Sequence, residues 1–216
     1  VVKKWKIKPD QTPYAINQTY FEADTDYPVS SLFVNTITDE DGKTTKEYKN
    51  TLGQVVLKEM PGGFKTYYVY DEFGLQRCVI PPKATNIDDD FCYYYKYDIK
   101  HRLVEKKIPG ATETVIMVYD KRDRLVLTQD GNMRNHIVNN VPSPQWMATL
   151  YDNNFDRPKI TGIYTQTGTT TDLINNIAGA LNYIPETELY KLSETYYDNY
   201  TGLSGYTYTK PVDGYE

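Results

Sequence analysis

Few residues in this sequence combine the type and the spacing that enzyme chemistry requires. There are only two histidines, His101 and His136, which is too few for a histidine-rich metal site. Neither belongs to a serine or cysteine nucleophile motif such as Gly-x-Ser-x-Gly. We therefore predict that the protein is not an enzyme and has no catalytic or cofactor-binding residues. The catalytic alternative is a hydrolase that uses a perturbed aspartate beside one of these histidines.

Two acidic runs bring carboxylates close together, at residues 88–90 (Asp-Asp-Asp) and 39–42 (Asp-Glu-Asp-Gly). Calcium needs several oxygens at short range, and three consecutive aspartates on an extended segment cannot all face one ion. The second run has the composition of a hairpin turn, and the other ligand positions of a calcium loop are missing. We predict no metal site.

The two cysteines, Cys78 and Cys92, are too few for a disulfide framework. They fall on segments that we expect to be neighbouring strands, so one bridge is possible. Two free, partly buried thiols are the favoured interpretation. The cysteine content therefore leaves the redox compartment open.

Tyrosine dominates the sequence, at 22 of 216 residues. A tyrosine followed by aspartate, or by a polar substitute, recurs at irregular intervals, which indicates repeats with variable loops. A β-rich run precedes each pair, a few turn residues follow it, and a second β-rich run comes next, which is the pattern of a β-hairpin. The pairs are Tyr48-Lys49, Tyr70-Asp71, Tyr97-Asp98, Tyr119-Asp120, Tyr151-Asp152 and Tyr197-Asp198.

The turn residues make the hairpin prediction specific. In the copy at 71–74, aspartate opens the turn and glycine takes its fourth position, as in a type I turn followed by a left-handed residue. Other copies have histidine or aspartate at the glycine position, and these residues tolerate positive φ better than most. The residues predicted to shape the turns are Asp71, Gly74, Asp98, His101, Asp120, Asp123, Asp152 and Asp156.

These patterns predict an all-β fold of antiparallel hairpins that form a curved sheet or partial barrel. Residues 1–43 are expected to form a leader and a first hairpin strand that pack on the repeats, and the prolines of the leader favour an irregular or edge-covering course. Residues 44–216 form the hairpin array. Apolar residues at helical spacing predict one short helix near 171–181, capped by Thr171 or Asp172. Trp146 is expected to anchor the core.

Alternating tyrosines create possible binding surfaces. Tyr93, Tyr95 and Tyr97 share one face of a predicted strand, and Tyr68 and Tyr70 are expected to share the equivalent face. Such rows hold strands together more often than they stack on sugars. The candidate ligand contacts are Tyr68, Tyr93, Tyr95 and Trp5, the last because it lies in a basic leader.

The motif Tyr-Asp-x-x-Gly-Arg-Leu resembles the YD repeat of the RHS (rearrangement hot spot) family. The copies at 70–75, 97–103 and 119–125 carry the resemblance, which covers roughly residues 44–162. It implies a secreted or cell-surface bacterial protein whose repeats form long ribbons that curl into a shell around a C-terminal toxin, or that bind carbohydrate. This chain has too few repeats to close a shell, and it lacks the sequence that releases a payload. An enclosing role would therefore belong to a longer parent chain.

Composition narrows the choice of partners. The net charge is −5, and the chain lacks the basic footprint of a nucleic-acid-binding protein. It has no apolar run of the ~18 residues that a spanning helix needs. Because the sequence starts at Val1 without a signal peptide, we expect a piece of a larger RHS-like chain. The first functional hypothesis is a structural scaffold, and the second is a module that binds a glycan or a protein.

Overall fold

A computed structural model describes residues 2–7, 21–84 and 90–197 of the 216-residue chain. The predicted all-β fold of antiparallel hairpins with a short helix is confirmed. The chain divides into two compact units, residues 1–117 and 118–216, and each is described by itself. The expected boundary at residue 44 separates the leader from the repeats, which is a different division from these two units, and it stays a prediction.

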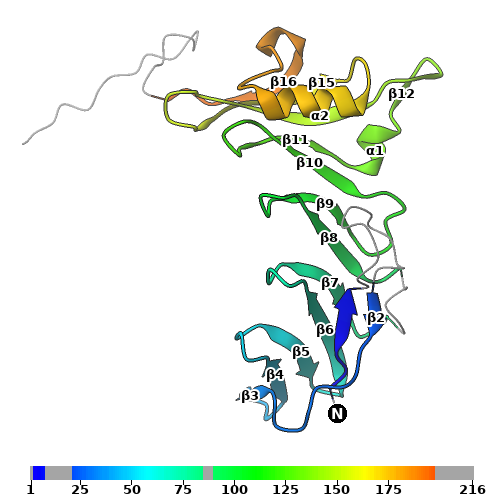
Figure 1. The fold of residues 1–216 in the computed structure, drawn as a ribbon. Helices are drawn as coiled ribbons and strands as arrows, with labels where there is room; N and C mark the ends of the chain where they lie inside the picture. The colour runs from blue at the N-terminus through cyan, green and yellow to red at the C-terminus, as the bar shows by residue number, and fades with distance from the viewer. Residues whose placement is uncertain (1, 8–20, 85–89, 198–216) are drawn as a thin grey trace, which may run out of the picture. The chain divides into compact units, whose positions relative to one another are not determined.

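Unit 1 is a meander in which each strand of the main sheet pairs with its sequence neighbours (Figure 1). The strands are short and rich in tyrosine, valine and threonine, as the pleated surface favours. They are β3 (Phe33–Thr38), β4 (Thr44–Lys49), β5 (Val55–Met60), β6 (Phe64–Tyr70), β7 (Gln76–Ile80), β8 (Tyr93–Tyr97), β9 (Leu103–Lys107) and β10 (Val115–Tyr119), which crosses the unit boundary.

A separate two-stranded sheet, β1 (Trp5–Ile7) with β2 (Phe21–Ala23), belongs to the leader. Trp5 packs edge-on against Tyr67 of β6, with ring centroids 6.3 Å apart. The prolines of the leader predicted an irregular or edge-covering course; these two segments form strands, because each finds a partner. Pro9 and Pro13, on which that expectation depended, lie outside the described residues.

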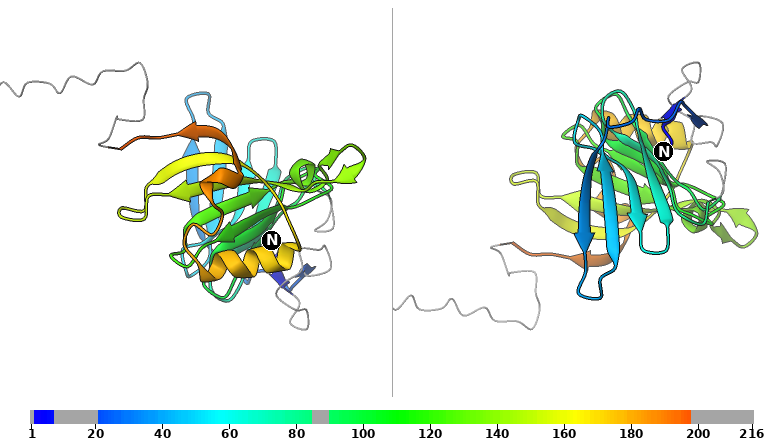
Figure 2. Two further views of the ribbon diagram at one scale, coloured as in Figure 1. Left: turned by 90° about the horizontal axis from the view of Figure 1, so that it is seen from above. Right: turned by 90° about the horizontal axis from the view of Figure 1, so that it is seen from below.

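Unit 2 continues the meander in the order β10, β11 (Leu125–Gln129), β14 (Gln145–Tyr151), β15 (Pro158–Thr165) and β16 (Leu189–Glu194). Trp146 of β14 is fully buried, as predicted, and its indole N–H donates to Gln166 Oε1 over 2.8 Å. Between β11 and β14 lie α1 (Gly131–Arg134) and a small hairpin of β12 (Ile137–Val138) and β13 (Val141–Pro142). Figure 2 shows this hairpin projecting beyond the neighbouring strands of the unit.

The predicted helix is α2 (Thr170–Gly179), followed by the 3₁₀ turn η2 (Glu186–Glu188). Its cap is Thr169, whose hydroxyl accepts a hydrogen bond from the backbone N–H of Asp172 over 3.1 Å, so the assignment of the cap to Thr171 or Asp172 is wrong. Leu173 and Ile177 form its buried face, as the helical spacing predicts.

The connections at the two ends of the strands differ in length. At one end, the hairpins close with short turns, at 50–54, 71–75 and 98–102 in unit 1 and at 120–124 and 152–157 in unit 2. At the other end, the connections vary from three residues between β5 and β6 to twenty-three between β15 and β16, where α2 lies. Neither unit closes into a barrel among the described residues, because β3 and β16 each pair along one edge only. No helix in that part of the chain is long and apolar enough to cross a membrane.

Candidate functional site

The aspartates of the repeats close the hairpin turns. At Asp71, one carboxylate oxygen accepts the backbone N–H groups of Phe73 and Leu75, at 3.1 and 2.8 Å. The turn is completed by backbone bonds from Gly74 to Asp71 and from Asp71 to Leu75. The same four bonds recur in the turns that begin at Asp98 and Asp120, and the turn at Asp152 is one residue longer. These carboxylates therefore act as hydrogen-bond acceptors that hold the turns in shape.

The fourth turn position has the left-handed backbone that the sequence predicts. Gly74 has φ of 79°, while His101 and Asp123 both have φ of 62°. Asp156, in the longer turn, has φ of 53°. Residues with short polar or imidazole side chains thus take a conformation that glycine adopts more easily.

The first copy is shifted by one residue from its predicted alignment. Asn50, rather than Lys49, opens this turn: its side-chain oxygen accepts from the N–H groups of Leu52 and Gln54, each at 3.0 Å. Tyr48 therefore lies one position too early to match the tyrosines of the other copies. The prediction was misled because Tyr48 is followed by a polar residue. The turn at 39–43 belongs to the same type, at the other end of β4.

The second carboxylate oxygen of each aspartate binds an arginine at the last position of the turn or, for Asp71, two residues beyond it, a role that the sequence analysis missed. Asp98 pairs with Arg102, and Asp120 with Arg124; in both pairs Nε lies 2.7 Å from Oδ2. Asp152 pairs with Arg157 at 2.9 Å, and Arg77 approaches Asp71 at 3.4 Å. In the first copy an amide pair, Asn50 with Gln54 at 2.7 Å, replaces the charges. The arginine after each turn was visible in the motif, but its partner was not.

The tyrosines of the repeats join each hairpin to the one before it. In unit 1 the hydroxyl of Tyr70 donates to the carbonyl of Val55, and that of Tyr97 to the carbonyl of Gln76, both at 3.1 Å. In unit 2, Tyr151 donates to Leu125 and Tyr197 to Pro158, both at 2.8 Å. Every acceptor is the first residue after the preceding turn. We call these four bonds the tyrosine staples.

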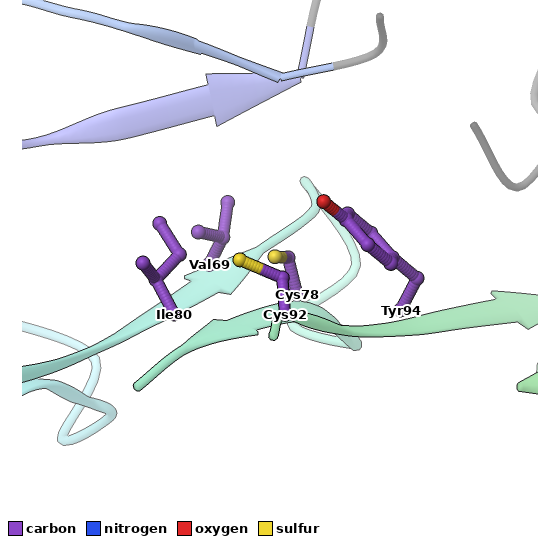
Figure 3. Close-up of a cluster of buried hydrophobic side chains, with 5 residues drawn as sticks. All are labelled: Val69, Cys78, Ile80, Cys92 and Tyr94. Carbon is purple, nitrogen blue, oxygen red and sulfur yellow. The ribbon is translucent and has the colours of Figure 1, made fainter. Parts of the chain in front are cut away.

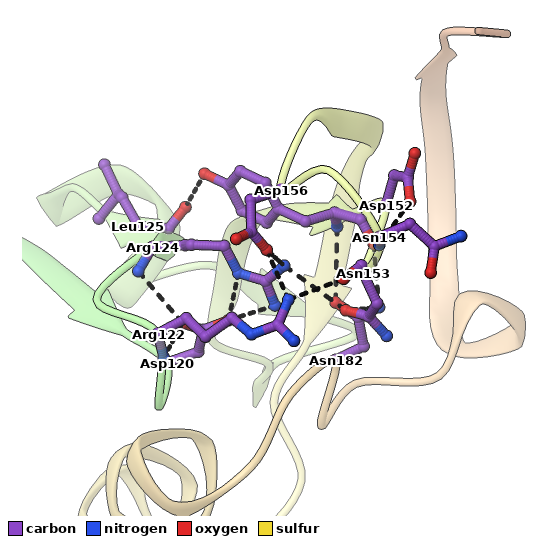
Figure 4. Close-up of polar contacts among 10 residues, drawn as sticks. Asp120, Arg122, Arg124, Leu125, Asp152, Asn153, Asn154, Asp156 and Asn182 are labelled. Carbon is purple, nitrogen blue, oxygen red and sulfur yellow. Dashed lines mark hydrogen bonds and ion pairs between the residues drawn. The ribbon is translucent and has the colours of Figure 1, made fainter. Parts of the chain in front are cut away.

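Unit 2 contains the most extended polar network (Figure 4). The Asp120–Arg124 pair is buried, with 2% and 8% of the residues exposed. The Arg124 guanidinium lies 4.7 Å from the ring centre of Tyr151 and also contacts Asp156 at 2.8 Å. Arg122 binds the same Asp156 oxygen at 2.8 Å. Each charge of the network has an opposite charge beside it, which stabilises the arrangement of the two turns.

The turn carboxylates predict a loss of stability in acid. Burial raises the pKa of Asp98, but the hydrogen bonds from Arg102 and from two backbone N–H groups outweigh it, and the pKa lies below its ordinary value of 3.8. A lowered pKa stabilises the fold above the unfolded-state pKa, and this contribution disappears as the pH falls through the folded-state pKa. We expect the free energy of unfolding, measured by urea titration between pH 7 and pH 2, to fall below about pH 4. In Asp98→Asn this decline should be shallower; an equal decline would contradict the assignment.

The tyrosine rows occupy the face that the alternation predicts. The register aligns Tyr68 with Val79 and Val79 with Tyr93, so both tyrosines lie on one face of the sheet. Tyr93 is 38% exposed, whereas Tyr68 and Tyr95 are half-buried. Trp5 is half-buried and packs against the buried cluster on the other face of the sheet, so it lies apart from this tyrosine row. Its role as a ligand contact stays a prediction.

A shallow apolar hollow of about 450 Å³ adjoins Tyr93. It lies at the end of the strands where the connections are long. Three of its side chains are exposed aromatics: Phe64 at 60%, Phe91 at 48% and Tyr93. Its lining consists of Phe64, Pro81, Pro82, Lys83, Phe91, Tyr93 and Pro109. Sequence reasoning found one of these seven residues, because prolines and phenylalanines from separate loops show no common spacing.

The two cysteines are free thiols within the core of unit 1 (Figure 3). Both are fully buried, in a cluster with Val69, Ile80 and Tyr94. Burial raises the pKa of the Cys78 thiol, and a hydrogen bond with Cys92 raises it further. The favoured interpretation of two free thiols agrees with the structure.

The two histidines lie in different surroundings. The ring of His101 lies 5.0 Å from that of Phe73 in the preceding turn, and Nδ1 of His136 lies 3.1 Å from the carbonyl oxygen of Ser143. Within residues 2–7, 21–84 and 90–197, no group of three His, Cys, Asp or Glu side chains is placed to hold a metal ion. Asp88 and Asp89 lie outside these residues, while Asp90 pairs with Lys107 at 3.2 Å.

No protein-family model matches the chain, and a search of curated proteins finds no match.

Proposed function

We propose that this chain is a non-catalytic scaffold segment of a larger secreted or cell-surface repeat protein of the RHS type. The tyrosine staples are the observation that supports the proposal most directly. A scaffold made of repeats depends on the coupling between neighbouring repeats, because each repeat contacts only the repeats next to it. The staples supply that coupling through the tyrosine of the motif.

The aspartate and arginine of the motif support the same function. The three residues act together: the aspartate closes a turn, the arginine binds the aspartate, and the tyrosine hydroxyl donates a hydrogen bond to the preceding hairpin. In unit 2 the arginines also lie against the next tyrosines: Arg157 is 4.1 Å from the ring centre of Tyr197. All three motif residues thus have structural partners, which leaves none of them for substrate chemistry.

The test removes one staple hydroxyl. We expect Tyr97→Phe to lower the free energy of unfolding by about 0.5–1.5 kcal/mol, since one hydrogen bond is lost and a part-buried carbonyl is left unpaired. Hydrogen exchange should become faster in both hairpins that the staple joins, β6–β7 and β8–β9. Urea unfolding and exchange mass spectrometry measure the two effects.

Tyr190→Phe is the matched control, because Tyr190 is 73% exposed and carries no staple. It should leave stability and exchange unchanged. If Tyr97→Phe behaves like this control, or loosens only its own hairpin, the staples do not couple the repeats and the scaffold proposal loses its support.

A second candidate function is the binding of a glycan or a protein segment at the apolar hollow. The observation that favours it is the exposure of three aromatic rings around one concavity, since aromatic faces are common contacts for sugars and for proline-rich or apolar peptides.

Tyr93→Ala tests this candidate. If the hollow binds glycans, saturable binding on a glycan array should be lost or reduced at least about tenfold, which corresponds to the ~1.4 kcal/mol expected from one aromatic contact. The circular dichroism spectrum should not change. Tyr190→Ala, an exposed tyrosine outside the hollow, should bind like the wild type. Equal binding by both variants would exclude Tyr93 as a contact for the glycan. An absence of binding by the wild type would exclude glycans as ligands.

A further inference from the structure

The two thiols of the chain lie side by side in the core of unit 1. Figure 3 shows the two sulfur atoms next to each other, between Val69 and Ile80 on one side and Tyr94 on the other. Cys78 and Cys92 are joined by a side-chain hydrogen bond, and both are fully buried. The fold thus holds the only two cysteines of the sequence in contact.

The strand register explains this proximity. Cys78 of β7 is paired with Tyr94 of β8, and Val79 with Tyr93. Cys92 precedes Tyr94 by two residues, so its side chain lies on the same face of the sheet, diagonally across from Cys78. Diagonal neighbours have Cα atoms roughly 7–8 Å apart, slightly beyond the usual span of a disulfide. Cys92 lies just before β8 begins, so a small shift of its backbone would not break the paired register.

We propose that Cys78 and Cys92 form a reversible intramolecular disulfide. The bond would join β7 to the residue just before β8. Pro81, Pro82, Lys83 and Phe91, four of the seven residues that line the apolar hollow, lie close to these two cysteines in the sequence. The site is therefore a modification site whose reactant class is a low-molecular-weight disulfide.

The chemistry needs two exchange steps. The thiolate of one cysteine attacks a sulfur of glutathione disulfide, which forms a mixed disulfide and releases one glutathione thiolate. The second cysteine thiolate then attacks the protein sulfur of the mixed disulfide, which forms the Cys78–Cys92 bond and releases the second glutathione. In total, two protein thiols are oxidised by two electrons and one glutathione disulfide is reduced to two glutathiones.

Burial decides when this reaction takes place. A buried thiol with a raised pKa provides little thiolate and no access to a reagent, so the folded, reduced protein should react slowly. The bond should instead form as the chain folds, when the thiols are still accessible and the hairpins begin to bring them together. The experiment therefore starts from the unfolded, reduced chain.

The decisive measurement is the equilibrium between the two thiols and a glutathione redox buffer. The chain is refolded across a series of ratios of reduced to oxidised glutathione, and the fraction that has lost 2 Da is measured by mass spectrometry after acid quenching. The same series in concentrated urea gives the value for the unfolded chain, where an effective concentration on the order of millimolar is expected. We expect the equilibrium constant for forming the disulfide to be about 100-fold larger in the folded chain than in the chain unfolded by urea.

A second readout checks the first by thermodynamic linkage. If the fold favours the bond about 100-fold, the bond must stabilise the fold by the same factor, about 2.8 kcal/mol at 1.4 kcal/mol per tenfold. The oxidised protein should therefore unfold at a higher urea concentration than the reduced protein. Cys92→Ala is the control, since it cannot form the bond and should show no difference between oxidising and reducing conditions.

Two results would overturn the proposal. One is a folded chain that forms the bond no more readily than the chain in urea, because the fold would then hold the sulfurs in a geometry that opposes it. The other is a refolded product that carries glutathione on single cysteines, or that dimerises through them, without the loss of 2 Da. The first result would leave the thiols as apolar core residues, and the second would assign them to intermolecular chemistry.

Discussion

Replacing Asp120 with alanine should lower the free energy of unfolding by about 3–5 kcal/mol, as expected when one partner of a buried ion pair is removed. The Arg124 guanidinium would remain buried, with only the exposed Asp156 as a charged partner. The turn would also lose the two backbone N–H bonds that Asp120 accepts. Urea unfolding at pH 7 measures the loss.

Two further variants separate these contributions. Asp120→Asn keeps a side-chain oxygen for the turn but removes the charge, so it should recover only part of the loss. Asp98→Ala removes the same bonds from a turn whose ion pair is about one-fifth exposed, so the loss should be smaller, about 1–2 kcal/mol. If the Asp98 and Asp120 variants were equally destabilised, burial of the pair would not be the cause.

Gly162→Ala is expected to destabilise unit 2 by about 1–3 kcal/mol, although alanine normally suits a strand better than glycine. Gly162 lies in β15 at a register shift opposite β16. A methyl group at this position would lie 2.8 Å from the backbone oxygen of Tyr190 and 3.3 Å from the Cα of Lys191. Because backbone atoms oppose the new group, the contact can be relieved only if β16 moves.

Hydrogen exchange can locate this effect. In Gly162→Ala, the amides of β16 should exchange faster, while those of β11 and β14 should change little. Gly179→Ala is the control, since a methyl group there meets no atom within 4 Å and the residue ends α2. That variant should be neutral or slightly stabilised. If the amides of β16 keep their wild-type exchange rates in Gly162→Ala, then β15 and β16 can accommodate the methyl group without destabilising β16.

The hairpins were predictable because their turns are encoded locally. The aspartate, the residue with positive φ and the flanking β-rich runs lie within a dozen residues of one another, so sequence alone located the turns at Asp71, Asp98 and Asp120. Where local signals conflicted, the prediction failed. Tyr48 resembled the repeat tyrosine, although the turn geometry depends on Asn50, and the helix cap was placed inside the helix because three threonines adjoin its start.

The contacts between repeats were not predictable, because one partner of each tyrosine staple is a backbone carbonyl. This acceptor always follows the preceding turn, but the residue that carries it is valine, glutamine, leucine or proline, so its side chain gives no signal. The pairing of β1 with β2 likewise depends on partners that short apolar runs do not reveal. Alternation identified the faces of β8 correctly, but it could not show that Trp5 packs against the buried cluster, because that contact joins segments far apart in the sequence.

The unequal connections at the two ends of the strands give each unit one constrained rim and one permissive rim. The short turns carry the staples and ion pairs and vary in length by one residue only, the turn at Asp152 being the longer one. The opposite rim already accommodates the proline-lined hollow in unit 1 and, in unit 2, helix α1 with its projecting hairpin. Insertions that bring new specificities should therefore accumulate on that rim, where a repeat can diversify without any change to its framework.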